Sequence, residues 1–385
     1  MITTINNKHK KLNVPNLRFP EFEGEWEEST IGEMFDLYSG NTPSRLNKEH
    51  FKGTVNWISS GELKEHYIYS SKEQISEEAA KSLKLLPVGT FVIAIYGLEA
   101  EGVRGTGSIT QEPSTISQAC MSFIQKGEIG NEFLYSWYKK HGNVIGIRYA
   151  QGTKQQNLSY DILEKFMIVY PKTKEQEKLN KLISLLDERI STQNKIIDKL
   201  QSLIKGIAQH CIRELINGWE YVRLGDICKI TTGKLDANAQ VENGQYPFFT
   251  CAERPFNIDC YAFDTEALLI SGNGANLGYI NYYKGKFNAY QRTYVLNHFS
   301  VNIQYVKWAL KVLLPQRIAI EKSSSNTPYI VLSTLADLKI PIPNNSKQNH
   351  IADLMMSFER KLSTQLVLSD LYNKQKQYLL RQMFI

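Results

Sequence analysis

The chain has 385 residues, of which 42% are hydrophobic and 22% are charged, a composition typical of globular proteins. This length suits two domains of ordinary size. The sequence has no run of about 18 apolar residues that would predict a membrane-spanning helix. The polar N-terminus does not resemble a secretory signal, so we expect a cytoplasmic protein.

The net charge of +6 is compatible with a polyanionic partner but does not require one. The excess of basic residues lies mainly in two segments with helical patterning, near 172–217 and 344–385. The five cysteines form no C-x-x-C pair and have no histidine at zinc-finger spacing. We therefore expect free thiols and no structural metal.

The sequence contains an internal duplication. Near the start of each copy, residues recur at a constant offset of 193: Trp26, Gly32 and Gly40 match Trp219, Gly225 and Gly233. Near the end the offset is 172: Pro171, Gln176 and Ser191 match Pro343, Gln348 and Ser363. The first copy is therefore about 21 residues longer in its interior. Two similar units with different interiors predict two similar tasks on different targets.

Each copy begins with strand patterns, which predict strands at 88–95, 116–124, 267–271 and 290–296. A short helix is predicted to begin at Asn131 and another at Asn302, because an asparagine side chain can cap free backbone N–H groups. Pro171 and Pro343 then each end a strand, since proline supplies no N–H to a β-ladder.

A long helix is predicted after each proline, with apolar residues at alternating steps of three and four. The expected interface residues are Leu179, Leu182, Leu186, Ile196, Leu200, Leu203, Ile207, Ile351, Leu354, Phe358, Leu368, Tyr372 and Leu379. Matched length and phase favour an antiparallel coiled coil over two helices that each cover only their own domain. About 38 residues rising roughly 1.5 Å each would form a rod of some 57 Å.

These patterns predict an α+β fold with two similar strand-rich α/β domains, each followed by a long helix, and pseudo-twofold symmetry. The expected boundaries are a flexible lead-in at 1–16, a first domain at 17–171, a first helix at 172–215, a second domain at 216–343 and a second helix at 344–385. Equivalent surfaces held at a fixed separation suit two half-sites on one DNA duplex.

The opening of the chain resembles the specificity subunits of type I restriction-modification enzymes. Residues 13–22 read NVPNLRFPEF and are followed by Trp26 and the triplet Ile31-Gly32-Glu33. The stretches SGNTPSR at 39–45 and WISSGEL at 57–63 are similar to the early part of that family's first target-recognition domain. The order of domains and helices extends the resemblance to nearly the whole chain.

The resemblance implies a subunit without catalytic residues, in which each target-recognition domain reads one half of a bipartite DNA site. The two helices would set the spacing between the half-sites and would dock partner subunits. The implied partners are double-stranded DNA, two modification subunits that methylate adenine N6, and two restriction subunits that translocate and cleave DNA. S-adenosylmethionine, ATP and Mg²⁺ would bind those partners, and this chain would hold no cofactor.

Enzyme alternatives have weaker support in the sequence. The tetrapeptide Asn326-Thr327-Pro328-Tyr329 departs from the N-P-P-Y of amino-methyltransferases at its second position, and the glycines at 272–278 have the spacing of a turn and not of a cofactor loop. Glu62 and Lys64, with Glu21, resemble a metal-dependent nuclease set, but the second copy has no counterpart. A free-standing DNA-binding regulator and a coiled-coil scaffold remain open alternatives.

Direct readout of DNA requires side chains with paired donors and acceptors on loops that reach base edges, and cations that reach phosphates. In the first copy the candidates are Arg45, Lys48, Arg104, Gln118, Lys154, Gln155, Gln156 and Asn157. In the second copy they are Lys234, Arg254, Asn276, Gln291, Arg292, Ser324, Asn326 and Tyr329. The densest polar loops, near 152–157 and 323–327, are equally compatible with plain solvent-facing turns.

Overall fold

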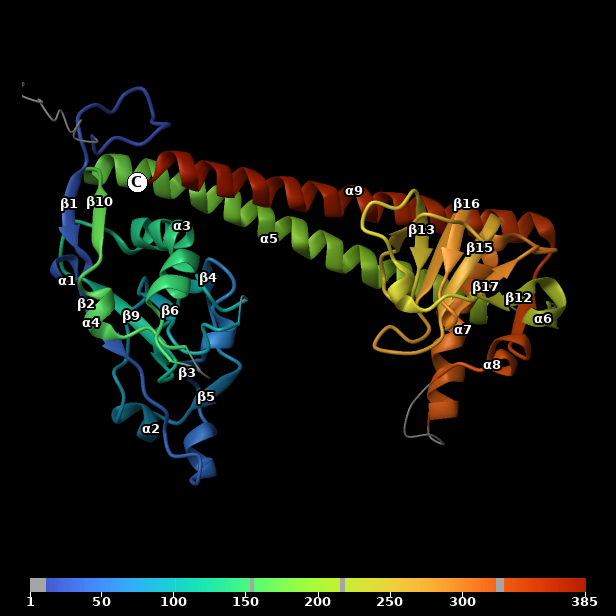
Figure 1. The fold of residues 1–385 in the computed structure, drawn as a ribbon. Helices are drawn as coiled ribbons and strands as arrows, with labels where there is room; N and C mark the ends of the chain where they lie inside the picture. Colours follow the sequence, from blue (N-terminus) through green and yellow to red (C-terminus); the bar gives the residue numbers. More distant parts are fainter. Residues whose placement is uncertain (1–11, 101, 153–155, 215–218, 323–328) are drawn as a thin grey trace, which may run out of the picture. The chain divides into compact units, whose positions relative to one another are not determined.

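A computed structural model describes residues 12–100, 102–152, 156–214, 219–322 and 329–385 (Figure 1). The chain forms two compact units. Unit 1 combines Met1–Lys195 with Val367–Ile385, and unit 2 comprises Ile196–Leu366. No helix among the described residues is both long enough and apolar enough to cross a membrane.

Unit 1 is built on three small sheets. Strand β1 (Glu27–Thr30) pairs antiparallel with β10 (Met167–Tyr170). A five-stranded sheet has the order β2 (Phe35–Ser39), β9 (Cys120–Gln125), β6 (Phe91–Ala94), β7 (Gly107–Thr110) and β4 (Tyr67–Ile68). A three-stranded sheet has the order β5 (Glu73–Ile75), β3 (Val55–Ile58) and β8 (Ser114–Ile116). The helices are α1 (Ile31–Met34), α2 (Glu77–Lys81), α3 (Asn131–Tyr149) and α4 (Tyr160–Leu163), with 3₁₀ turns at Lys48–Phe51 and Ser60–Glu62.

Unit 2 repeats this plan with fewer insertions. Strand β11 (Glu220–Arg223) pairs antiparallel with β18 (Lys339–Ile342). A six-stranded sheet has the order β12 (Lys229–Thr232), β17 (Thr293–Asn297), β15 (Phe263–Ser271), β16 (Ile280–Ala289), β13 (Tyr246–Phe249) and β14 (Phe256–Ile258). The helices are α6 (Leu224–Ile227), α7 (Ile303–Lys322) and α8 (Leu332–Ala336), with a 3₁₀ turn at Ala237–Ala239.

The predicted duplication is confirmed in the topology of the sheets. The strand order β2-β9-β6 of unit 1 corresponds to β12-β17-β15 of unit 2, and the outer pair β1-β10 corresponds to β11-β18. The interior of unit 1 carries β3, β4, β5 and α2 between its β2 and β6. The greater length of the first copy therefore lies in its interior, as predicted from the decrease in sequence offset between the copies from 193 to 172.

The long helices α5 (Thr173–Gln209) and α9 (Asn345–Met383) follow the two prolines as predicted. Within unit 1 they run antiparallel. The guanidinium of Arg189 lies 4.6 Å from the centre of the Tyr372 ring, and the Ser369 hydroxyl lies 3.1 Å from Asn194 Oδ1. The later residue of α5, Asn194, therefore contacts the earlier residue of α9, Ser369, as expected for antiparallel helices.

The predicted stripe of interface residues is displaced by one position in the second half of α5. Ile196 is 43% exposed and Leu203 is 51% exposed, whereas the neighbouring Ile197 and Ile204 are buried. Gln193, Ile197, Leu200 and Ile204 are buried at alternating steps of four and three, so the packed face keeps a heptad repeat but uses the neighbouring apolar position at alternate contacts. The other predicted interface residues are buried or half-buried: Leu179, Leu182, Leu186, Leu200, Ile207, Ile351, Leu354, Phe358, Leu368, Tyr372 and Leu379.

Two repeated glutamines attach the long helices to their domains. The Gln176 amide accepts from the Gly130 N–H (3.1 Å) and donates to the Pro171 carbonyl (2.8 Å). Gln348 makes the equivalent bonds to the Asn302 N–H (3.0 Å) and the Pro343 carbonyl (2.8 Å). Both side chains are buried, and each amide satisfies one buried carbonyl and one half-buried N–H of the backbone.

Several local predictions differ from the structure. The strand predicted at 116–124 is interrupted by a turn between β8 and β9. Asn302 does cap its helix, accepting from the Gln304 N–H at 2.9 Å, but Asn131 instead donates to the Gly89 carbonyl at 2.7 Å. The helices that follow, α3 and α7, have 19 and 20 residues and are not short.

The N-terminal segment also differs from the predicted flexible lead-in at residues 12–16. The Asn13 carbonyl accepts from the Trp26 N–H at 2.8 Å, and Pro15 is buried. Just beyond it, Arg18 forms a largely buried ion pair with Glu175 of α5 at 2.7 Å. These contacts hold the segment on unit 1 from residue 12 onwards.

Candidate nucleic-acid interface

Each unit presents an exposed glutamine on the same tight turn of its main sheet. In unit 1 the Cys120 N–H donates to the Ser117 carbonyl at 2.9 Å, and in unit 2 the Thr293 N–H donates to the Tyr290 carbonyl at 2.8 Å. Gln118 and Gln291 occupy the second position of these turns, and both are exposed. Each turn leads directly into β9 or β17, so a rigid strand fixes the position of the glutamine.

A repeated glycine explains why the two turns are alike. A Cβ on Gly40 would lie 2.2 Å from the Ile116 carbonyl oxygen, and a Cβ on Gly233 would lie 1.8 Å from the Ala289 carbonyl oxygen. Only glycine permits this close approach of two backbones. The residues after the glycines, Asn41 and Lys234, are therefore held beside the turns, and both are exposed.

In unit 1 the segment 95–98 joins three polar loops. The Ile95 N–H donates to the Ala119 carbonyl (2.9 Å), and the Leu98 N–H donates to the Gln156 carbonyl (3.0 Å). The structure thus brings Gln118, Gln156 and Asn157 to one end of the sheet. Arg104 joins this group, because its guanidinium donates to the Leu98 carbonyl at 3.4 Å.

In unit 2 the described residues at the equivalent end of the sheet include the cations Lys234 and Arg292. The Arg292 carbonyl accepts from the Gly272 N–H (2.8 Å), and the Gly272 carbonyl accepts from the Ile330 N–H (2.8 Å) beside the exposed Tyr329. The Gln291 N–H donates to the Leu235 carbonyl at 2.9 Å, next to Lys234. The cluster is completed by Asn276, which donates to the Cys251 carbonyl at 3.1 Å, and by the exposed Arg254 three residues after Cys251.

Some predicted contacts lie elsewhere or are already engaged. Arg45 forms two hydrogen bonds with Glu73 (3.0 and 2.8 Å) and lies over the Phe51 ring at 4.5 Å, so its guanidinium already has partners. Lys48 is exposed on the 3₁₀ turn that ends at Phe51. Lys154, Gln155, Ser324 and Asn326 lie outside the described residues.

Asn41 is a residue that the sequence analysis missed. Its position is equivalent to Lys234 at the offset of 193, which would have identified it. Gln118 and Gln291 were each predicted, but not their equivalence, because their offset of 173 differs from that of the glycines.

The groups considered for catalysis have structural roles. Glu62 accepts hydrogen bonds from the Ser59 hydroxyl (2.6 Å) and N–H (2.9 Å), and Glu21 pairs with Lys178 of α5. The glycines at 272–278 form turns, with φ of +79° at Gly274 and +80° at Gly278, and a strand follows. Among the described residues, no group of three or more His, Cys, Asp or Glu side chains is placed to hold a metal ion.

The fold and the two loop clusters define a duplicated α+β protein with one polar, loop-built surface in each unit. Residues 23–202 and 216–367 each match the family model described as the type I restriction modification DNA specificity domain. The specificity subunit of the Escherichia coli type I restriction enzyme EcoDI is 44% identical over 135 residues, which cover 35% of this chain and 30% of that protein. The MjaIX specificity subunit of Methanocaldococcus jannaschii is 25% identical over 364 residues, which cover 83% of each chain.

Solved structures agree with this similarity at the level of the fold. The crystal structure of a type I restriction-modification S subunit from M. genitalium covers 97% of this chain and 99% of its own, with a TM-score of 0.68 and 18% identity. The chain therefore belongs to the type I restriction-modification DNA specificity family and carries the family domain twice. This confirms the resemblance found in its opening residues, and it places the chain among specificity components and not among catalytic ones.

Proposed function

We propose that this chain is the DNA-reading subunit of a type I restriction-modification complex, and that each unit reads one half of a bipartite site. The observation that carries the proposal is the equivalent exposed turn that presents Gln118 in unit 1 and Gln291 in unit 2. A glutamine amide carries the paired donor and acceptor that match the N6 and N7 edge of adenine. Lys234 and Arg292 suit phosphates or guanine in the second half-site.

The helices would serve as spacer and docking surface. Both expose large apolar side chains, which on a protein surface commonly mark sites for partner proteins. In unit 1 these are Leu185, Val367, Leu371 and Tyr378, and in unit 2 they are Ile196, Leu203 and Leu366. The proposed occupants are two modification subunits, to which two restriction subunits are added. S-adenosylmethionine, ATP and Mg²⁺ would act on those partners in the cytoplasm.

The proposed division of the chain follows these roles. Residues 17–171 and 216–343 form the two target-recognition domains, and residues 172–215 and 344–385 form the spacer helices. Because the two halves differ most in their interiors, they would read different base sequences.

The test is co-expression of the chain with its methyltransferase subunit, followed by sequencing of modified adenines in genomic DNA. We expect an interrupted motif whose two halves are separated by unread bases. Gln118→Ala and Gln291→Ala form a matched pair, and each should relax a different half of the motif.

Two other outcomes would identify the alternatives. Tight sequence-specific binding that needs no methyltransferase subunit would indicate a free-standing regulator. Partner binding with no dependence on DNA would indicate a scaffold, and relaxation of both half-sites by one glutamine substitution would refute independent recognition domains.

A further inference from the structure

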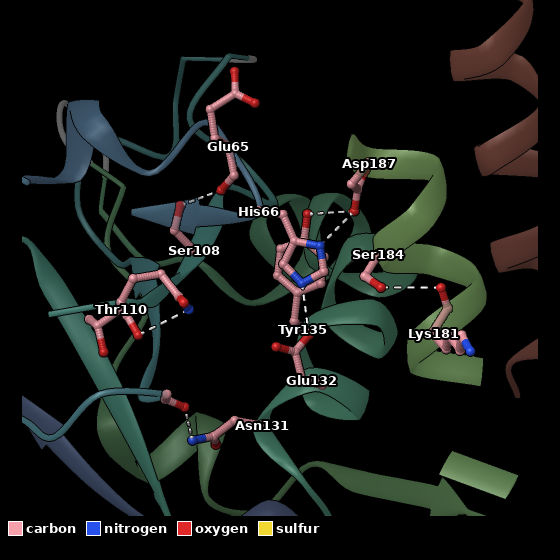
Figure 2. A network of polar contacts seen from close by, with 12 residues as sticks. Glu65, His66, Ser108, Thr110, Asn131, Glu132, Tyr135, Lys181, Ser184 and Asp187 are labelled. Atoms are coloured by element: carbon pink, nitrogen blue, oxygen red, sulfur yellow. Dashed lines mark hydrogen bonds and ion pairs between the residues drawn. The ribbon is translucent and has the colours of Figure 1, made fainter. Parts of the chain in front are cut away.

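A buried histidine joins the first domain to the long helices in unit 1 (Figure 2). The His66 side chain is 4% exposed, and its Nε2 lies 2.8 Å from Glu132 Oε2 of α3. Its Nδ1 lies 2.9 Å from Asp187 Oδ2 of α5. The ring is stacked between Tyr67 and Tyr135, with centroid distances of 4.1 and 3.9 Å.

This environment favours a charged imidazolium. A neutral imidazole donates only one hydrogen bond, whereas both nitrogens of His66 face carboxylate oxygens, which accept. The Nδ1–H does not point straight at Asp187, so that contact is chiefly electrostatic. Burial alone would lower the pKa of His66, but the close contacts with the negative charges of Asp187 and Glu132 outweigh it and raise the pKa above its ordinary value.

Cations from α9 and α3 complete the network. Lys376 of α9 pairs with Asp187, and the Tyr135 hydroxyl lies 3.3 Å from the same carboxylate. Burial would raise the pKa of Asp187, but its contacts with His66 and Lys376 lower it. Lys139 of α3 lies 5.1 Å from the Tyr135 ring, and burial together with repulsion from Lys376 lowers its pKa to about 8. Glu65, next to His66, adds a further negative charge to the surroundings of Lys139.

Unit 2 has an equivalent carboxylate on its own long helix. Glu359 of α9 corresponds to Asp187 at the offset of 172. Its oxygens lie 2.6 Å from Lys307 Nζ and 3.1 Å from Lys311 Nζ, and both lysines belong to α7 of the same unit. The carboxylate is therefore retained in both copies, whereas its partners are His66 and Lys376 in one copy and two lysines of α7 in the other.

The two carboxylates lie at the same distance along their helices from the repeated glutamines. Gln176 and Asp187 are eleven positions apart on α5, as are Gln348 and Glu359 on α9. Eleven residues complete about three turns, so the two side chains lie on the same face of the helix. Each long helix thus holds its own domain at two polar points on one face.

We propose that Asp187 and Glu359 are equivalent positioning residues that fix each recognition domain on its helix. In unit 1 this attachment of the first domain to α5, called the joint below, depends on pH because it contains a charged His66. The effect on DNA reading rests on the proposed function, whereas the charge state of His66 does not. Because the charged form makes the contacts, the joint is complete below the ordinary pKa of histidine, as long as the carboxylates of Asp187 and Glu132 are ionised. It weakens as pH rises through the raised pKa of His66.

The charge state is tested on the full chain, with ¹⁵N-labelled histidine followed by NMR between about pH 6 and pH 9. The spectrum of His66→Gln identifies the His66 signals. We expect both ring nitrogens of His66 to stay protonated above the pH at which exposed histidines titrate, and Asp187→Asn to lower the midpoint. Glu359→Gln is the matched control and should leave the midpoint unchanged. Titration of wild-type His66 at or below the ordinary value would overturn the proposal.

The positioning role is tested in the complex with the methyltransferase subunit. Asp187→Asn should weaken the reading of one half-site and so reduce methylation by about tenfold or more. Asp187→Glu should partly restore methylation. Glu359→Gln should weaken the reading of the other half-site. Wild-type activity should fall as pH rises through the His66 midpoint, and His66→Gln should remove that step. An unchanged step in His66→Gln would refute the pH-dependent joint.

The two failures can be told apart. If the chain does not read DNA, the NMR midpoint still decides the charge of His66. If His66 proves neutral while Gln118→Ala still relaxes one half-site, the proposed function stands without this joint.

Discussion

Replacement of the repeated glycines by alanine tests the two recognition surfaces independently. In Gly233→Ala the new Cβ would lie 1.8 Å from the Ala289 oxygen and 2.7 Å from the Tyr290 oxygen, both backbone atoms of the turn that carries Gln291. Side-chain Cβ atoms essentially never approach closer than 3.0 Å, so the turn must move by roughly 1.2 Å. Forced overpacking of this kind costs about 1–3 kcal/mol.

A movement of that size takes Gln291 out of hydrogen-bonding range of a base edge, because the acceptable range of distances spans only about 0.5 Å. Gly233→Ala should therefore abolish recognition of one half-site and leave the other intact. Gly40→Ala should affect the opposite half-site, with a smaller displacement because its Cβ would start 2.2 Å from the nearest oxygen.

The assay is the sequencing of modified adenines together with thermal unfolding of each variant. Gly206→Ala on α5 is the control, because a Cβ there meets nothing within 4 Å. It should stabilise the chain by about 0.5–1 kcal/mol and leave both half-sites unchanged. Normal recognition of both half-sites by Gly233→Ala would show that the close backbone approach at this glycine does not position Gln291.

Three further predictions follow from the described contacts. Gln348→Ala leaves one buried and one half-buried backbone group without partners and should lower the free energy of unfolding by about 1–4 kcal/mol, as should Gln176→Ala. A loss below about 0.5 kcal/mol in chemical denaturation would contradict the role of these amides. The Arg292 side chain is exposed, so Arg292→Ala should leave thermal stability unchanged. It should weaken binding of one half-site roughly 5- to 150-fold in a competition assay. Equal losses at both half-sites would count against a role of Arg292 in reading only one of them. Four residues inserted after Ser191 and four after Leu371 would lie beside the contacts of Arg189 with Tyr372 and of Asn194 with Ser369. The insertions should lengthen the unread spacer by about 6 Å, or roughly two base pairs. An unchanged spacer in the methylation motif would eliminate the helices as its determinant.

The sequence predicted the elements of the fold that depend on local and repeated patterns. The matched glycines and glutamines revealed the duplication, and the apolar periodicity after Pro171 and Pro343 revealed α5 and α9. Boundaries were less accurate where a short turn lies between two strand-forming stretches, as at 117–120, because β-branched and aromatic residues favour a strand on either side of it.

The packed face of α5 was only partly predictable. A heptad repeat is satisfied equally by Ile196 with Leu203 and by Ile197 with Ile204, and the structure buries the second pair. Where two adjacent positions are both apolar, the sequence does not distinguish the buried one from the exposed one.

The amino-acid sequence alone therefore determined that the chain is two similar α+β domains, each with a long helix, because periodicity and repetition are local properties. Only the tertiary structure decided that Gln118 and Gln291 occupy equivalent turns, that Arg45 is already paired with Glu73, and that His66 faces Glu132 and Asp187. These contacts join residues from 28 to 121 positions apart or depend on close backbone packing. No local pattern specifies them, since they form only once the sheets and helices have packed.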